Sequence, residues 1–422
     1  KAKRKMEKSE GNKASSLIMI LKNNPKYSLF QLANLISRFG DSLDSIAFGW
    51  MVYDITKSAL SMSLFFLINV LPNLIFSLPS GVIADRKSNK KLILIGYAGR
   101  GLVVLALSLL YAAKLIEPWM IYTGTFINST LETFSMPALS AIIPKIIDKK
   151  LIAKTTGYFS SIRSLVELLG VSIAGVLIVA IGTPYVILID AFTFFIAFFI
   201  IMFIRVKEVR ETSALTVKAG IKDLGEAYVY VKKEPIIFVI IVCGALTNLA
   251  FTPLNVSEVI YVKDILKIGA KGMSLFSAAI SLGAILGGFY VGKRAASLNL
   301  LHIFSWALLA AAISYFVLGM PAFFAVTIPF TVIIIVDVFF LSFFVSIMNT
   351  ILSAYLMQSV PQEMLGRVFS LLSMLIMIAM PLGSLLSGAA EYIGVPMLII
   401  IASVLILISA LYLEIYMKMK RL

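Results

Sequence analysis

The chain has 422 residues, of which 60% are hydrophobic and 14% are charged, and its mean hydropathy is +0.97. A soluble domain averages about 45–50% apolar and about 25% charged residues, so the composition excludes a soluble globular protein. Disordered and disulfide-rich classes are also excluded, because apolar residues are abundant and Cys243 is the only cysteine. A polytopic membrane protein remains.

Apolar runs of about 20 residues, long enough to cross a bilayer as helices, recur along the whole chain. We expect an all-α membrane protein with twelve transmembrane helices. The runs cover approximately residues 29–53, 59–84, 91–113, 117–143, 155–181, 184–205, 235–262, 271–296, 299–318, 326–358, 364–391 and 395–417.

The basic residues predict the orientation of these spans. The two terminal segments and the connections that follow even-numbered spans hold 29 of the 37 Lys and Arg residues. By the positive-inside rule, both termini are expected in the cytoplasm. The net charge of +15 is therefore interpreted as membrane topology and not as a nucleic-acid surface. The opposite side carries Lys57, Lys114, Lys263, Lys267 and Lys271.

A polar connection at 206–234 divides the spans six and six, and its stretch 217–231 could form an amphipathic helix on the membrane surface. We expect a tail at 1–28, six-helix halves at 29–205 and 235–417, and a tail at 418–422. The halves resemble each other, because the glycine-rich segment 170–175 matches 383–388 at an offset of 213 residues. Two such halves imply a pseudo-two-fold axis along the membrane normal, with a cavity between the halves.

The segment 81–91, Gly-Val-Ile-Ala-Asp-Arg-Lys-Ser-Asn-Lys-Lys, resembles the signature between spans 2 and 3 of the major facilitator superfamily. Segments 40–41, 136–139, 365–370 and 380–388 are similar to its drug:proton antiporter branch, which includes bacterial macrolide efflux proteins and siderophore exporters. The resemblance implies the twelve-helix fold and a multi-pass protein of a bacterial cell membrane. The sequence departs from the branch at Asn128, where many proton-coupled exporters have Arg, at Val171, where they have Pro, and at Gly292, where the second-half signature would have Asp.

The resemblance also implies a cytoplasmic gate. Asp85 could accept hydrogen bonds from the N-terminus of a neighbouring helix that starts near Gly366, and Gly81 would permit close approach. The alternative is a plain positively charged loop. The expected gating residues are Gly81, Asp85, Arg86, Lys90, Lys91, Gly366 and Arg367.

Charged residues at membrane depth are costly and therefore indicate functional sites. Asp41, Asp44 and Glu132 are candidates for proton coupling, since two carboxylates held close together cannot both keep their charge cheaply. The alternative is a structural pair of Arg38 with Asp41. His302, the single histidine, lies at a span end, so a histidine relay is not expected.

Candidates for substrate contact are Asn248, Asn255, Asp337, Glu167 and Arg163. The spacing of Arg163 and Glu167 equally suits a buried structural ion pair. Arg100 is expected to be a structural partner of some carboxylate. Four glycines suit either close helix packing or a hinge, namely Gly170, Gly175, Gly383 and Gly388.

We therefore expect a secondary transporter that exports amphipathic, macrolide-like molecules in exchange for protons, without cofactor or metal and as a monomer. A siderophore, a lysolipid or another metabolite is the alternative cargo. An integral membrane enzyme or a channel is less favoured, because the sequence shows neither catalytic motifs nor a filter, and the absence of a Walker loop argues against ATP.

Overall fold

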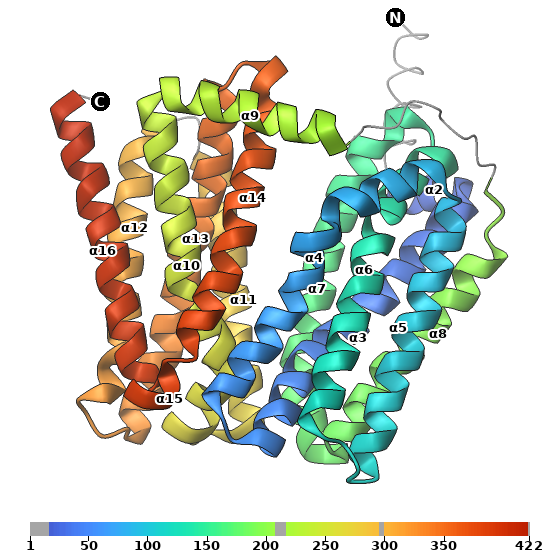
Figure 1. Ribbon diagram of the computed structural model, residues 1–422, viewed down its shortest axis with the longest axis horizontal. Coiled ribbons are helices and arrows are strands. Elements are labelled where there is room, and N and C mark those ends of the chain that lie inside the picture. The colour runs from blue at the N-terminus through green and yellow to red at the C-terminus, as the bar shows by residue number, and fades with distance from the viewer. Residues whose placement is uncertain (1–16, 207–216, 295–298, 421–422) are drawn as a thin grey trace, which may run out of the picture.

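The computed structural model describes residues 17–206, 217–294 and 299–420, all in helices and their connections (Figure 1). A short helix α2 (Leu17–Asn23) precedes the first bundle. The first bundle holds α3 (Pro25–Thr56), α4 (Ala59–Arg86), α5 (Asn89–Ala112), α6 (Pro118–Ile146), α7 (Lys149–Ile181) and α8 (Thr183–Phe203). The second holds α10 (Pro235–Ile260) with the π-turn η1 (Tyr261–Ile265), α11 (Gly269–Arg294), α12 (Leu300–Gly319) with the 3₁₀ turn η3 (Met320–Ala322), α13 (Ile328–Ser359), α14 (Gln362–Ser387), α15 (Ala390–Ile393) and α16 (Val395–Lys420).

Helix boundaries follow local signals in the sequence. Proline occupies the first turn of α3, α6, α8, α10 and α13, where its missing N–H has no partner to lose. Between α3 and α4, Lys57 takes a left-handed backbone conformation and the Ser58 hydroxyl accepts a hydrogen bond from the Ser61 N–H. Such tight connections place successive helices antiparallel.

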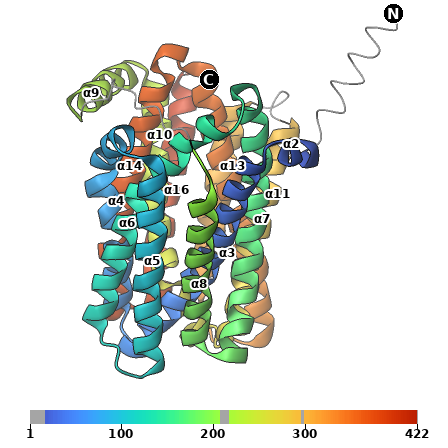
Figure 2. The same cartoon turned by 90° about the vertical axis from the view of Figure 1, so that its right-hand side faces the viewer.

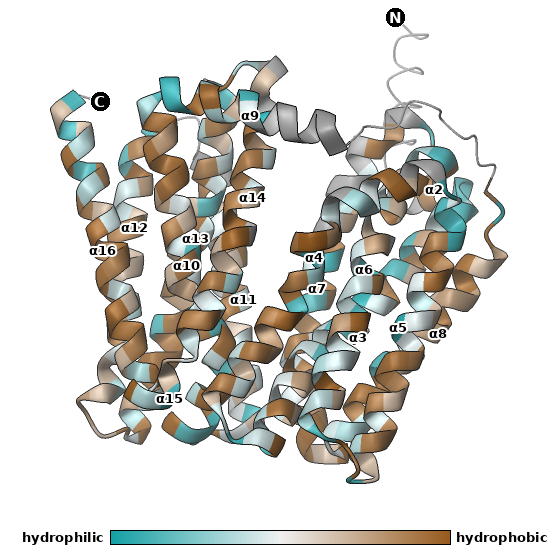
Figure 3. Cartoon of the chain, in the orientation of Figure 1, coloured by the Kyte–Doolittle hydropathy of each residue, from teal (hydrophilic) through white to brown (hydrophobic). Residues whose placement is uncertain are grey.

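Within the described part, ten helical segments are long and apolar enough to cross a membrane. The two long bundle helices that fall short of this criterion are α3 and α6. Helix α3 carries Arg38, Asp41 and Asp44, and α6 carries Glu132 among several hydroxyl and amide side chains. Hydrophobic residues run along the helices of both bundles (Figure 3), and many of their large apolar side chains are exposed, among them Leu102 of α5 and Trp306 of α12. Both helices that fall short of the criterion therefore carry charges inside the first bundle, whereas α5, which carries Arg100, meets it because the rest of the helix is strongly apolar.

Both bundles have two recognisable ends. We call the end that carries α2, the last turn of α16 and α9 (Val217–Lys233) the terminal end, and the opposite end, with α15, the distal end (Figures 1 and 2). The segment expected to form an amphipathic helix is helical as α9, which lies across the terminal end, and its place on the membrane surface stays a prediction. It buries Ala227 and Val231, exposes Tyr228, and pairs Glu226 with Arg367 of α14 at 2.5 Å.

The described side-chain contacts between the two bundles gather towards the distal end. The Ser384 hydroxyl donates a hydrogen bond to the Ser63 carbonyl at 2.5 Å, and the Gly175 N–H donates one to the Ser274 hydroxyl oxygen at 2.9 Å. The Glu391 carboxylate caps the start of α4, and Lys263 pairs with Asp54. The bundles are thus held together at the distal end in this conformation.

Two pairs of glycines related by the 213-residue offset occupy equivalent places. A Cβ on Gly170 would lie 2.6 Å from Ser42 of α3, and one on Gly383 would lie 2.6 Å from Thr252 of α10, both within their own bundle. A Cβ on Gly175 would meet the Ala270 carbonyl at 1.9 Å, and one on Gly388 would meet Leu60 at 3.1 Å, both across the interface. The glycines serve close packing here, and a hinge role stays a prediction.

Gly175→Ala should open this interface. Because the new Cβ would overlap the Ala270 carbonyl oxygen, α7 and α11 must separate. Overpacking of this kind typically costs about 1–3 kcal/mol. We expect lower thermal stability in detergent and reduced transport in proteoliposomes. Gly225→Ala in α9 is the matched control, since no described atom lies within 4 Å of its Cβ position. Equal behaviour of the two variants would contradict the close contact.

The expectation that Gly81 permits close helix approach stays a prediction, because the residues near Gly366 that it would approach lie outside those whose side chains are described. No described atom lies within 4 Å of a Cβ built on Gly81, because the contacts between the bundles lie at the other end. The side chains of Asp85 and Arg86, and the surroundings of Gly366, are not among those that the structure describes. Among the other expected gating residues, Lys90 Nζ donates to the Met202 carbonyl at 2.8 Å and the Lys91 N–H donates to Ser88. The gate itself stays a prediction.

Candidate functional site

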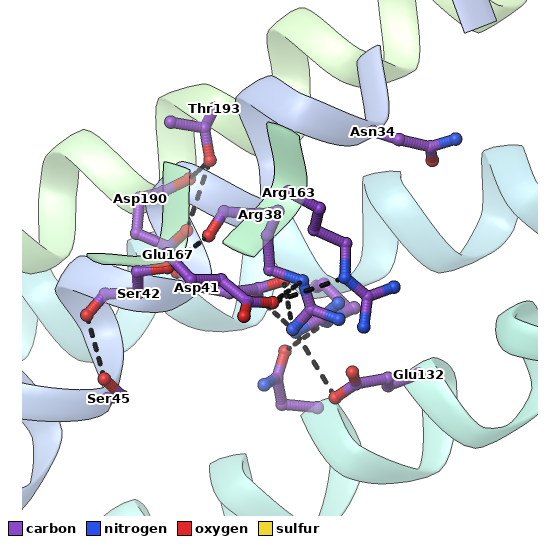
Figure 4. A network of polar contacts seen from close by, with 12 residues as sticks. Asn34, Arg38, Asp41, Ser42, Ser45, Glu132, Arg163, Glu167, Asp190 and Thr193 are labelled. Atoms are coloured by element: carbon purple, nitrogen blue, oxygen red, sulfur yellow. Dashed lines mark hydrogen bonds and ion pairs between the residues drawn. The ribbon is translucent and has the colours of Figure 1, made fainter. Parts of the chain in front are cut away.

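A network of charged side chains lies inside the first bundle, centred on Asp41 of α3 (Figure 4). Arg100 of α5 donates from Nη2 to Asp41 Oδ1 at 2.8 Å and approaches Glu132 of α6 at 3.5 Å. The Arg100 side chain is 9% exposed and Asp41 is 17% exposed. A guanidinium held between two carboxylates compensates their charges, while Glu132, whose side chain is 35% exposed, remains partly accessible.

Arg100 is fixed by two further contacts. Its Nε donates to Asn128 Oδ1 of α6 at 3.2 Å, and its guanidinium carbon lies 4.3 Å from the centre of the Phe194 ring on α8. Asn128 is the position at which the sequence resemblance would place an arginine. Here the central cation comes from the neighbouring helix instead. The expectation that Arg100 pairs with a carboxylate is confirmed.

A second set of ion pairs borders the first. Arg38 Nε lies 3.2 Å from Glu167 Oε1 of α7, and its Nη1 lies 4.0 Å from Asp41. Arg163 lies 3.3 Å from the same Glu167 oxygen. The expectation of a buried Arg163–Glu167 pair is wrong in one respect, because these side chains are 54% and 40% exposed. Glu167 is shared between two arginines at the edge of the network.

Two cavities meet at the central charges. One of about 330 Å³ extends towards the terminal end, past Phe30, Asn34 and Ile143. The other, of about 260 Å³, extends towards the distal end, past Phe48, Phe65 and Thr125. The residues that line both cavities are Arg38, Asp41, Arg100 and Glu132. These four side chains therefore form a layer that separates the two cavities, one on its terminal side and one on its distal side.

Two carboxyl groups of the first bundle have an oxygen without a hydrogen-bond partner among the described residues. Asp44 lines the distal cavity, and its Oδ1 is buried and unpartnered. Asp190 of α8 is fully buried; its Oδ1 accepts from the Thr193 hydroxyl at 3.2 Å, while Oδ2 has no partner. Asp190 was not among the expected site residues, although a lone carboxylate in an apolar span was a signal for it.

The second bundle holds the remaining candidates, and no described contact joins them to the charged network. Asn248 donates to the Gly244 carbonyl of its own helix at 2.9 Å, Asn255 is exposed, and Asp337 has a buried, unpartnered Oδ2. Glu258, which the sequence did not single out, accepts from the Ser277 hydroxyl at 3.0 Å. Their role in substrate contact stays a prediction.

Comparison with known proteins agrees with this architecture. Residues 22–421 match the family MFS_3, described as "Transmembrane secretion effector". Macrolide efflux protein A of Streptococcus pyogenes is 23% identical over 399 residues, which cover 92% of this chain and 96% of that protein. The Staphyloferrin A transporter of Staphylococcus aureus is 26% identical over 159 residues, or 37% of this chain and 40% of that protein.

Solved structures with the same fold include a mutant form of the nucleoside transporter NupG, at 12% identity, 92% and 98% coverage of the two chains and a TM-score of 0.73. A bacterial homologue of the iron transporter ferroportin in an inward-facing state aligns at 16% identity, 94% and 99% coverage and a TM-score of 0.72. Both likenesses concern the fold alone. The predicted all-α membrane fold is confirmed, and the chain belongs to the MFS_3 family of major facilitator transporters and is not an enzyme.

Proposed function

We propose that this transporter exports amphipathic small molecules, macrolide-like compounds among them, across a bacterial cell membrane in exchange for protons. The observation that carries the proposal is the Asp41–Arg100–Glu132 layer, which lies between two cavities and faces both. A carboxylate that contacts each space in turn can take a proton from one side and release it to the other. The similarity to macrolide efflux proteins supports the choice of cargo.

The charge distribution supports the orientation of the chain in the membrane. The terminal end carries most of the Lys and Arg residues, so by the positive-inside rule it faces the cytoplasm. The contacts between the bundles then lie towards the outer side of the membrane, and this conformation is open to the cytoplasm. An exporter would load its cargo in that state and an importer would release its cargo there, so the choice of export rests on the similarity to macrolide efflux proteins. Aromatic side chains beside the charges, such as Phe30 and Phe159, suit an amphipathic or cationic molecule.

A siderophore is the second candidate cargo, because the chain is similar to the Staphyloferrin A transporter over part of its length. The two cargo classes differ in charge. A polycarboxylate siderophore would need cationic contacts such as Arg163 and Arg38, whereas a cationic macrolide would be attracted by Glu167 and Glu132. A transport assay with both compounds separates these alternatives.

Gradient-driven uptake into inside-out proteoliposomes tests the function. We expect the wild type to transport a macrolide only when the lumen is acidic, and Asp41→Asn to lose this dependence because it removes the carboxylate between the cavities. Asp44→Asn and Glu132→Gln test the other two candidates. Glu117→Gln is the matched control, since Glu117 precedes α6 and accepts a hydrogen bond from Trp119 in the first turn of that helix, away from the network. Transport by the wild type that ignores the gradient would refute proton exchange.

A further inference from the structure

Asp190 lies behind the charged layer, against the backbone of α3. A Cβ on Gly40, the residue before Asp41, would lie 2.2 Å from Asp190 Oδ1, so the carboxyl group rests directly on that helix. Asp190 lines neither of the two described cavities at the network. In Figure 4 it lies on one side of Asp41, with Glu132 on the other. The group is fully buried, and its Oδ2 has no partner among the described residues.

The charges of the network do not balance without protons. The network contains three arginines, namely Arg38, Arg100 and Arg163, and five acidic residues, namely Asp41, Asp44, Glu132, Glu167 and Asp190. The described ion pairs use all three arginines on Asp41, Glu132 and Glu167. Asp44 and Asp190 remain without a cation. An isolated carboxylate at this depth costs several kcal/mol, so such a group stays neutral.

The groups that face Asp190 come from four helices. Asp41 and Asp44 lie on α3, Arg100 on α5, Glu132 on α6 and Thr193 on α8 itself. Only Arg100 among them is a cation. Its guanidinium lies over Phe194, four residues beyond Asp190 and so one helical turn away. Arg100 therefore lies between its present partner, Asp41, and the helix that carries Asp190.

We propose that Asp190 is a second proton-binding residue of the transport site, a reserve from which Asp41 is protonated. In this conformation Asp190 holds the proton and Asp41 is ionised beside Arg100. When Arg100 turns towards α8, the O–H bond at Asp190 breaks and one forms at Asp41. The total charge of the network stays the same. Asp41, which borders both cavities, then releases this proton to one of them. The proposal rests on proton exchange as the proposed function.

Infrared spectroscopy of the purified, substrate-free protein tests the protonation state directly. We expect the wild type at neutral pH to show a carbonyl band of a protonated carboxylic acid that is absent from Asp190→Asn. Thr193→Val should shift that band, because it removes the hydroxyl group that lies 3.2 Å from Asp190 Oδ1. Identical spectra of the wild type and Asp190→Asn would overturn the proposal. This measurement needs no gradient, so its failure is distinct from a failure of the proposed function.

Transport measurements then test the role of the proton. Asn keeps the shape of the side chain but cannot donate a proton, so Asp190→Asn should retain counterflow of labelled against unlabelled macrolide. Gradient-driven transport should fall about 100-fold, the lower end of what a positioned proton-transfer group contributes. The pH profile of the remaining transport should also shift, which a merely structural role would not produce. Unchanged gradient-driven transport and an unchanged pH profile in Asp190→Asn would overturn the proposal.

Discussion

Arg100→Gln should abolish transport and destabilise the first bundle. Arg100 is the only described cation in contact with Asp41 and Glu132 together, and it also binds Asn128. Removing one partner of a buried ion pair typically costs about 3–5 kcal/mol, because the remaining charges lose their compensation. We expect a clear drop in the thermal unfolding midpoint in detergent and no gradient-driven macrolide uptake.

A double variant separates stability from function. Arg100→Gln combined with Asp41→Asn removes both charges of the closest pair, so most of the lost stability should return. Transport should not return if Asp41 binds the transported proton as proposed, because neither this carboxylate nor its cation is left. Recovery of transport in the double variant would show that the pair is only structural.

Arg100→Lys is a more conservative test of geometry. A lysine keeps the positive charge but presents a compact ammonium in place of the planar fork that serves three partners at once. We expect it to fold nearly as well as the wild type and to transport poorly. Transport at the wild-type level would mean that charge alone is needed at this position.

Much of the fold follows from local patterns in the sequence. Three helices begin at a proline, namely α3 at Pro25, α6 at Pro118 and α10 at Pro235, as expected because proline is favoured in the first helical turn. The short connections between successive helices require these helices to run antiparallel. The 213-residue repeat also anticipated the equivalent packing of Gly175 and Gly388 across the interface. These features depend on residues close in sequence or on the internal symmetry.

The site was less predictable, because its contacts join residues far apart in sequence. Asp41 was recognisable as a charge at membrane depth, but its pairing with Arg100, 59 residues away, was not. Asp190 stands out because one of its carboxyl oxygens has no hydrogen-bond partner among the described residues. The sequence could not predict this, because it depends on how α8 packs against α3. Glu391 was missed because a carboxylate at the end of a span looks like an ordinary loop residue.

Glu391→Gln should weaken the closure of the distal end. Glu391 of α15 belongs to the second bundle, yet its Oε2 accepts hydrogen bonds from the Ala59 N–H at 2.7 Å, the Leu60 N–H at 3.2 Å and the Ser58 hydroxyl at 3.1 Å. It therefore caps α4 of the first bundle from outside. An anion at a helix N-terminus is stabilising because the helix dipole leaves partial positive charge there.

The size of the effect follows from these contacts. Glu391 is exposed, so water screens part of the interaction, and we expect the contact to contribute about 1–2 kcal/mol to the closed state. This corresponds to a shift of roughly 5- to 30-fold in the ratio of closed to open molecules. The neutral amide of glutamine keeps the length of the side chain and removes the charge.

Distances between spin labels at the distal end measure this shift. Leu115→Cys in the first bundle and Phe324→Cys in the second are exposed positions, and Cys243 is buried, so labelling should be selective. We expect Glu391→Gln to add a population with a longer distance. Glu117→Gln changes the charge of the same end by the same amount without a described contact between the bundles, so its distances should match the wild type.

A second contact between the bundles provides the decisive comparison. Lys263 of η1 pairs with Asp54 and lies 4.6 Å from the Trp50 ring, and Tyr53 donates a hydrogen bond to Asp264. Lys263→Met should therefore favour the open state as well. The residues that Glu391 and Lys263 contact, Ser58 and Asp54, are four positions apart, so the double variant measures whether the two effects on the free energy of closure add or are coupled. Short distances retained in the double variant would show that the packing of α7 on α11 and of α14 on α4 closes the distal end without these charges.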